Sequence, residues 1–126
     1  MTAAFSFPLV ARLGAFVAFL LFVTFGFLPV VPFTMLGVDM VPEGLLMARR
    51  MSALFLGVSL IMFFARDSDD SPLRRSVCAS LSASMAALAL FGLYDFVGGR
   101  VGPGIWIAII VESYFACALA VNARGR

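Results

Sequence analysis

Four long apolar segments dominate the sequence, and short polar, proline-rich or glycine-rich segments separate them. A bilayer core about 30 Å thick needs about 20 helical residues to cross it, and each segment is close to that length. The pattern predicts transmembrane helices at residues 13–31, 44–65, 73–97 and 103–122. We expect an all-α fold, with the four helices arranged as two helical hairpins in a bundle that forms one transmembrane domain over residues 1–126.

The connecting segments differ in character. Residues 1–11 contain a proline and are expected to form an interfacial arm, and the apolar connection at 32–43 is expected to lie along the membrane surface. Residues 66–72 are acidic but lack the glycine and distal glutamate of an EF-hand loop, so we interpret them as a hydrated turn. Ser71-Pro72 is typical of an N-cap followed by a first helical residue, and Gly98-Gly99 ends the third helix.

The third segment is rich in small residues at four-residue spacing. Small residues on one helical row let membrane helices approach closely, and serine hydroxyls can bond across the contact. We therefore expect this helix to be the most enclosed of the four, with a serine-lined polar path as the alternative interpretation. The rows are Ala79, Ala83 and Ala87, and Ser76, Ser80 and Ser84.

Composition supports a membrane protein and excludes several other classes. Of the 126 residues 63% are hydrophobic and 13% charged, whereas a soluble domain has about 45–50% and 25%. The net charge of +2 provides no basic nucleic-acid-binding face, and there is no histidine. Cys78 and Cys117 stand apart without a C-x-x-C pair, and we expect both to be buried small hydrophobic residues. The sequence predicts no metal, no cofactor and no enzymatic nucleophile–base pair.

Arginine distribution predicts the orientation, because cytoplasmic loops carry the excess of positive charge. One side of the predicted topology holds Arg12, Arg66, Arg74, Arg75, Arg124 and Arg126, and the other holds Arg49, Arg50 and Arg100. We expect a multi-pass protein of the cell inner (plasma) membrane with both termini in the cytoplasm. The first apolar run is too long for a signal peptide, so we interpret it as an uncleaved span.

The fourth segment contains one carboxylate, Glu112, near its middle. A charge at the bilayer centre costs about 2.5–3.5 kcal/mol on insertion scales, so Glu112 has to be protonated, paired or exposed to an aqueous cavity. Measured from the cytoplasmic ends of their helices, Arg50 lies about 24 Å deep and Glu112 about 18 Å deep. This difference is within the reach of an arginine and predicts a pair between Glu112 and Arg49 or Arg50. Arg49 is favoured slightly because it shares a face with Ala53 and Gly57.

Asp95 lies at the outer end of the third helix, where the helix dipole disfavours an acid and a nearby cation is expected. Arg100 and the two arginines of the second helix are the candidates. We therefore predict a polar cluster in the outer half of the bundle, with Tyr94 and Tyr114 as candidate hydrogen-bond donors. Its charged members are Arg49, Arg50, Asp95, Arg100 and Glu112.

Two functions remain open at this point. A buried pair between Glu112 and an arginine would fix helix register in a non-enzymatic accessory or scaffold protein, acting as a homo-oligomer or within a larger membrane complex. Alternatively, Glu112 serves a small proton-coupled transporter or a protein that binds a lipid or small molecule, since ionisable residues inside membranes are functional candidates by default. A catalytic role for Glu112 is the least favoured interpretation.

Two short motifs carry a resemblance to a known group of proteins. They are Ala-Arg-Arg-Met-Ser-Ala-Leu-Phe-Leu-Gly at residues 48–57 and Gly-Pro-Gly-Ile-Trp…Val-Glu at residues 102–112. In these motifs and in length, the chain resembles small four-span bacterial integral membrane proteins of unknown function. The resemblance implies four spans and no assigned activity. DoxX-like proteins also have four short spans, but their glycine-rich pattern is not matched here.

Overall fold

The computed structural model describes residues 3–125, which contain five α-helices and a short 3₁₀ helix and no strands. The elements are η1 (Ala3–Phe5), α1 (Phe7–Phe27), α2 (Val30–Leu36), α3 (Pro42–Ala65), α4 (Pro72–Val97) and α5 (Ile105–Ala123). Helices α1, α3, α4 and α5 are long and apolar enough to cross a membrane. The predicted all-α class with four spans is confirmed, and the chain is a multi-pass integral membrane protein.

The first helix starts earlier than predicted. Helix α1 begins at Phe7, so the end of the expected interfacial arm is helical instead. Pro8 explains the early start, because a proline in the first helical turn loses no hydrogen bond and has the right φ. Phe7, Val10 and Ala11 are buried against the other helices, which anchors this turn.

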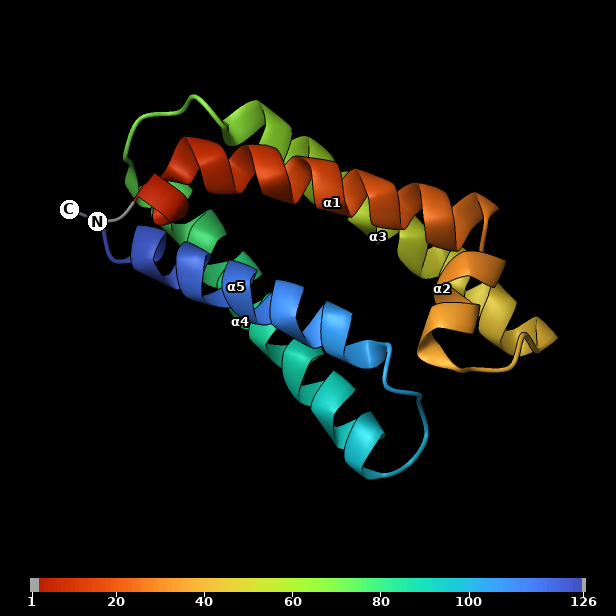
Figure 1. Cartoon of the computed structure of the whole chain (residues 1–126). Coiled ribbons are helices and arrows are strands. Elements are labelled where there is room, and N and C mark those ends of the chain that lie inside the picture. The colour runs from red at the N-terminus through yellow and green to blue at the C-terminus, as the bar shows by residue number, and fades with distance from the viewer. Residues whose placement is uncertain (1–2, 126) are drawn as a thin grey trace.

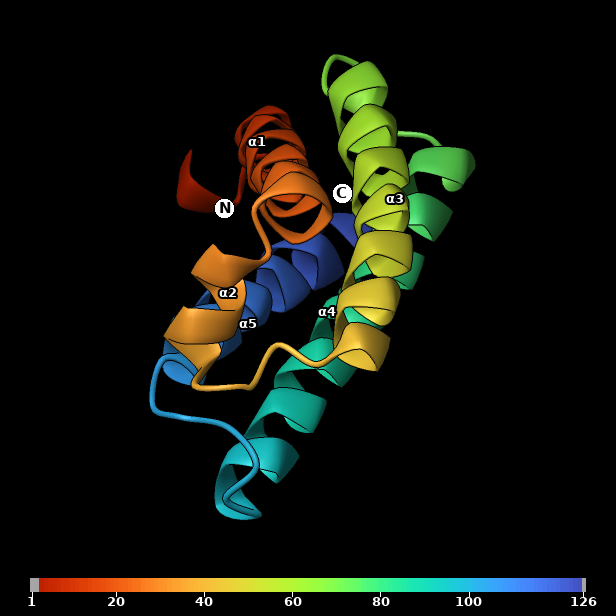
Figure 2. The same ribbon diagram turned by 90° about the vertical axis from the view of Figure 1, so that its right-hand side faces the viewer.

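The apolar connection after α1 contains the additional helix α2. Gly37 ends this helix with a left-handed φ of 65°, a conformation that glycine adopts without a Cβ penalty. Beyond it, the Gly102 N–H donates to the Leu36 carbonyl at 2.7 Å. A Cβ at Gly104 would overlap the Met35 carbonyl, so only glycine permits this approach between α2 and the α4–α5 loop. Seen along the bundle, α2 lies between the end of α1 and the start of α5 (Figure 2).

The long helices form two antiparallel hairpins, α1 with α3 and α4 with α5, and α1 contacts α5 between them (Figure 1). The hairpins lie close together where both chain ends and the α3–α4 loop meet, and they diverge toward α2 and the α4–α5 loop (Figure 1). We call the first region the closed end (residues 3–15, 59–82 and 115–123). The second is the open end (residues 27–50 and 92–106).

The hydrophobic core lies at the closed end and takes residues from all four long helices. It consists of Phe7, Val10, Ala11, Ala15, Met62, Cys78, Phe115, Ala118 and Leu119. Each hairpin also has one interhelical hydrogen bond: the Ser59 hydroxyl donates to the Ala15 carbonyl and the Ser82 hydroxyl to the Ala116 carbonyl, both at 2.7 Å. Packing and these bonds together hold the four helices at this end.

Helix α4 is the least enclosed span, which makes the prediction for it wrong. Only 11% of its most apolar window is buried, against 22–28% in the other three spans. Both large and small residues of α4 are exposed, and its buried residues are Cys78 and Gly92. Ser76, Ala79, Ser80, Ala83 and Ser84 are all exposed. Their three hydroxyls donate to carbonyls four residues earlier and are thereby satisfied within the helix.

Candidate functional site

Glu112 lines a crevice between the two hairpins, and every long helix contributes to its walls. The Glu112 crevice is lined by Gly14, Val17, Ala18, Leu21, Phe55, Val58, Met62, Leu81, Met85, Leu88, Val111, Glu112, Phe115 and Leu119. Among these lining residues Glu112 is the single titratable side chain. A mostly apolar pocket with one polar group is the usual make-up of a small-molecule site.

The crevice is small and partly open. Its cavity measures about 60 Å³, within an empty space of about 530 Å³ that includes open surroundings. Lining side chains from all four long helices are part-exposed, among them Val17, Phe55, Leu81 and Val111. The crevice is therefore accessible from the surroundings of the bundle, and its small volume suits a linear chain better than a ring system.

Glu112 has no polar partner within residues 3–125. None of the ion pairs or hydrogen bonds among these residues involves its carboxyl group, which is only partly buried. An unpaired carboxylate in hydrocarbon costs about 2.5–3.5 kcal/mol on insertion scales. The group must therefore be protonated, or a group outside residues 3–125 must supply its partner.

The predicted pair between Glu112 and an arginine of α3 is absent from the described part of the chain. Arg49 and Arg50 are exposed and form no ion pair with residues 3–125. The two arginines and Glu112 lie at similar depths along their helices but are separated laterally. Helices α3 and α5 belong to different hairpins and make few contacts with each other. The face expected to pack is also open, since Ala53 is exposed and a Cβ at Gly57 would meet no atom within 4 Å.

Asp95 and Arg100 do come together. The Arg100 Nε donates to the Asp95 carboxylate at 2.8 Å, and its Nη2 donates to the Tyr94 carbonyl at 3.1 Å. The guanidinium also lies over the Tyr94 ring, 4.4 Å from its centroid. This group closes the C-terminal turn of α4 at the open end, apart from the Glu112 crevice. The predicted five-residue cluster is therefore divided among three places.

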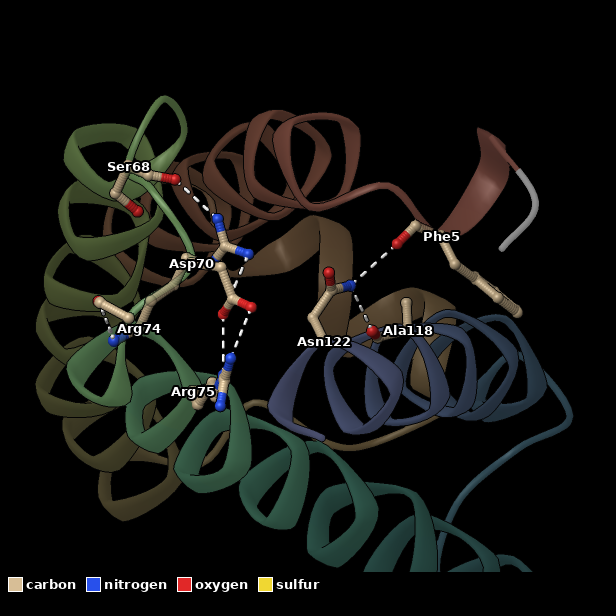
Figure 3. A network of polar contacts seen from close by, with 8 residues as sticks. Phe5, Ser68, Asp70, Arg74, Arg75, Ala118 and Asn122 are labelled. Carbon is tan, nitrogen blue, oxygen red and sulfur yellow. Dashed lines mark hydrogen bonds and ion pairs between the residues drawn. The ribbon is translucent and has the colours of Figure 1, made fainter. Parts of the chain in front are cut away.

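A polar network at the closed end was not predicted (Figure 3). The Asp70 carboxylate accepts from Nε and Nη2 of Arg75 at 2.9 and 2.8 Å, and Arg74 Nη2 lies 3.5 Å from it. Arg74 also donates to the Ser68 carbonyl at 2.7 Å, and its guanidinium covers the Phe7 ring at 4.4 Å. An acid four and five residues before two arginines was the available sequence signal, but the loop was interpreted as a hydrated turn.

The C-terminal helix joins the same end through side-chain donors. The Asn122 amide donates to the Phe5 carbonyl at 2.9 Å and to the Ala118 carbonyl at 2.8 Å (Figure 3). The Tyr114 hydroxyl donates to the Ala4 carbonyl at 2.7 Å, so it does not take part in a cluster with Glu112. A second crevice of about 370 Å³ lies between Asn122 and the Asp70 network. These contacts fix η1 and the loop onto the bundle.

The remaining chemistry of residues 3–125 is limited. Cys78 is buried as expected, but Cys117 is exposed on α5, so the prediction for Cys117 is wrong. Within these residues no group of three or more side chains of metal-binding type gathers. Comparison with protein-family models, curated proteins and solved structures gives no match for this chain. The Glu112 crevice is therefore the candidate functional site of the described residues.

Proposed function

We propose that the protein is a small membrane-embedded binding protein that takes a single-chain hydrophobic molecule, either a lipid or a small molecule, into the Glu112 crevice. The observation that carries the proposal is an unpaired carboxyl group in an otherwise apolar crevice. A residue that only fixed helix register would be expected to have its partner within the same chain. The proposal assigns binding and no chemical reaction.

The walls and the mouth of the crevice support this function. Apolar side chains from four helices offer contact along a hydrocarbon chain, and Glu112 offers one polar anchor that orients it. Because the crevice is partly open and lies between membrane-spanning helices, a hydrophobic ligand enters from lipid without passing through water. Membrane helices gain stability from packing rather than from water exclusion, so an open crevice between hairpins is tolerated.

The orientation in the membrane is part of the proposal. The start of α1, the α3–α4 loop and the end of α5 all lie at the closed end (Figure 1). The arginine excess of the sequence falls on the same side, which supports a cytoplasmic closed end in a bacterial inner membrane. The open end then lies in the outer half of the bilayer.

A matched pair of substitutions on α4 tests the function. Leu88→Trp places a bulky ring in the crevice wall, whereas Leu90→Trp adds the same ring at a site that is 66% exposed. Native mass spectrometry of protein purified in mild detergent should detect a retained hydrophobic molecule in the wild type and in the Leu90 variant. The Leu88 variant should lose it. Protein that carries no such molecule, or two variants with equal occupancy, would contradict the proposal.

An accessory or scaffold role is the second candidate, and the outward face of α4 favours it. Exposed small residues with internally satisfied hydroxyls suit close approach by another membrane helix. A homo-oligomer or a larger complex would cover Ala83 and its neighbours. Ala83→Trp should then lower the oligomeric mass measured in native nanodiscs, while Ile110→Trp, at a site of α5 that is 66% exposed, should not. A monomer in both the wild type and the variants would remove this candidate.

A further inference from the structure

The Glu112 crevice offers its ligand a single acid with no opposing charge. The parts of α1, α3 and α4 that line it contribute only apolar residues and glycine. The charged groups of these helices lie elsewhere: Arg12 of α1 pairs with Asp67 at 3.6 Å, and Arg74 and Arg75 of α4 face Asp70.

The other charged side chains of these helices do not line the crevice either. Arg49 and Arg50 of α3 are exposed, and neither they nor Glu43 lines it. Asp95 of α4 is occupied by Arg100. The crevice wall of α5 carries no titratable group besides Glu112 itself, since Tyr114 reaches the Ala4 carbonyl and Cys117 is exposed.

We propose that the crevice selects a single-chain amphiphile with an ammonium head, and that this cation replaces a proton on Glu112. The inference rests on the binding function proposed above and names its ligand class. The exchange is balanced as protein–COOH plus R–NH₃⁺ giving protein–COO⁻·⁺H₃N–R plus H⁺. The oxygen–hydrogen bond of the carboxyl group breaks, an ion pair with the ammonium forms, and the proton leaves to water.

Electroneutrality is the reason for the exchange. A carboxyl group inside a membrane is tolerated when it carries a proton or when a cation lies against it, but not as a lone anion. The proton and the ammonium therefore exclude each other at Glu112. Ammonium N–H groups form charge-assisted hydrogen bonds to a carboxylate, which are stronger than neutral ones. An anionic amphiphile cannot form such an ion pair, because no cationic side chain of residues 3–125 lines the crevice.

The shape of the crevice limits the body of the ligand. The cavity measures about 60 Å³, and its walls combine aliphatic side chains such as Val17 and Leu81 with the rings of Phe55 and Phe115. A saturated chain fits between such side chains, and its length extends through the mouth into lipid. The ligand class is therefore a long-chain primary amine or a close relative of one.

Three probes with one chain and different heads test the inference: dodecylammonium, dodecanol and dodecanoate. Each is titrated into the purified protein in a neutral maltoside detergent, and native mass spectrometry counts the bound chains. Dodecylammonium should bind about tenfold tighter than dodecanol at neutral pH, and dodecanoate should not bind. Its affinity should rise with pH by at most about tenfold per unit and level off once the ligand-free carboxyl group ionises, because one proton leaves for each cation that binds the protonated group.

Two variants complete the experiment. Glu112→Gln should still bind dodecanol but lose both the preference for the cation and the pH dependence, whereas Glu112→Asp should retain both. Equal binding of all three probes, or a preference for the cation that survives in Glu112→Gln, would overturn the exchange and leave the binding function intact. Absence of binding by any probe to the wild type would overturn both. Size-exclusion elution of each variant verifies that it is folded.

Discussion

The two ends of the bundle are held together by different means. At the closed end, nine core residues from four helices pack together, and side-chain hydrogen bonds tie η1, the α3–α4 loop and α5 to one another. At the open end, the hairpins diverge and a backbone hydrogen bond joins α2 to the α4–α5 loop. Glu112 lies between these regions, in the crevice left by the divergence. The contrast indicates that stability is concentrated at the closed end, and that the crevice next to this core is left open to a ligand.

Removing a core side chain from the closed end should have the largest effect on stability. Leu119 is 2% exposed, and Leu119→Ala should lower the free energy of unfolding by about 2–3 kcal/mol. This is the lower part of the range for core Leu→Ala changes, because in lipid chiefly the packing is lost. The control Leu90→Ala, at a lipid-facing position, should change it little. Unfolding of each variant in mixed detergent micelles gives the values, and equal losses would remove the distinction between the two ends.

Loss of the tie from α5 to η1 should have a smaller effect. Asn122→Ala removes the donor to the Phe5 carbonyl, which should cost about 1 kcal/mol, the usual value for one intramolecular hydrogen bond. Amide hydrogen exchange should accelerate in η1 (Ala3–Phe5) and remain unchanged in α2. Ser113→Ala, at an exposed position of α5, provides the control. Faster exchange at α2 as well would show that the two ends are not independent.

Ser59→Ala tests the hydrogen bond within the first hairpin. The Ser59 hydroxyl donates to the Ala15 carbonyl on the neighbouring helix, and such bonds in membranes average about 0.6 kcal/mol. Ser84→Ala should be neutral, because its hydroxyl bonds within its own helix at an exposed position. Thermal unfolding of both variants side by side separates the two cases. A larger loss in Ser84→Ala would mean that the outward face of α4 is covered by another chain.

The sequence was informative about the elements and less so about how they meet. Apolar segment lengths predicted the four spans because crossing a bilayer fixes helix length, whereas α2 lies in an apolar connection that carries no span-length signal. The start of α1 was missed because Pro8 was interpreted as part of an arm and not as a first-turn residue. Helical spacing identified the small-residue rows of α4, but spacing alone does not decide which face meets lipid.

For the candidate site too, the sequence indicated which residue was important but not how it is surrounded. The position of Glu112 in the middle of a span identified it as the residue to explain, and Arg100 was correctly among the candidate partners of Asp95. Arg49 and Arg50 were predicted as partners of Glu112 because they lie at a similar depth along the helix axes. Depth leaves the lateral arrangement open, and the pairing of helices into hairpins separates α3 from α5. The rotation of each helix about its axis and its lateral neighbours depend on contacts between residues far apart in the sequence. These contacts cannot be predicted from a single sequence.

Glu112→Gln provides the most direct measurement of the central claim, that Glu112 is an unpaired acid reserved for a ligand. The substitution keeps shape and hydrogen-bonding capacity and removes the charge. Since no side chain of residues 3–125 pairs with Glu112, the ligand-free protein should keep its free energy of unfolding unchanged or slightly increased. A loss of about 3–5 kcal/mol, the cost of breaking a buried ion pair, would contradict the account and restore a structural role for Glu112.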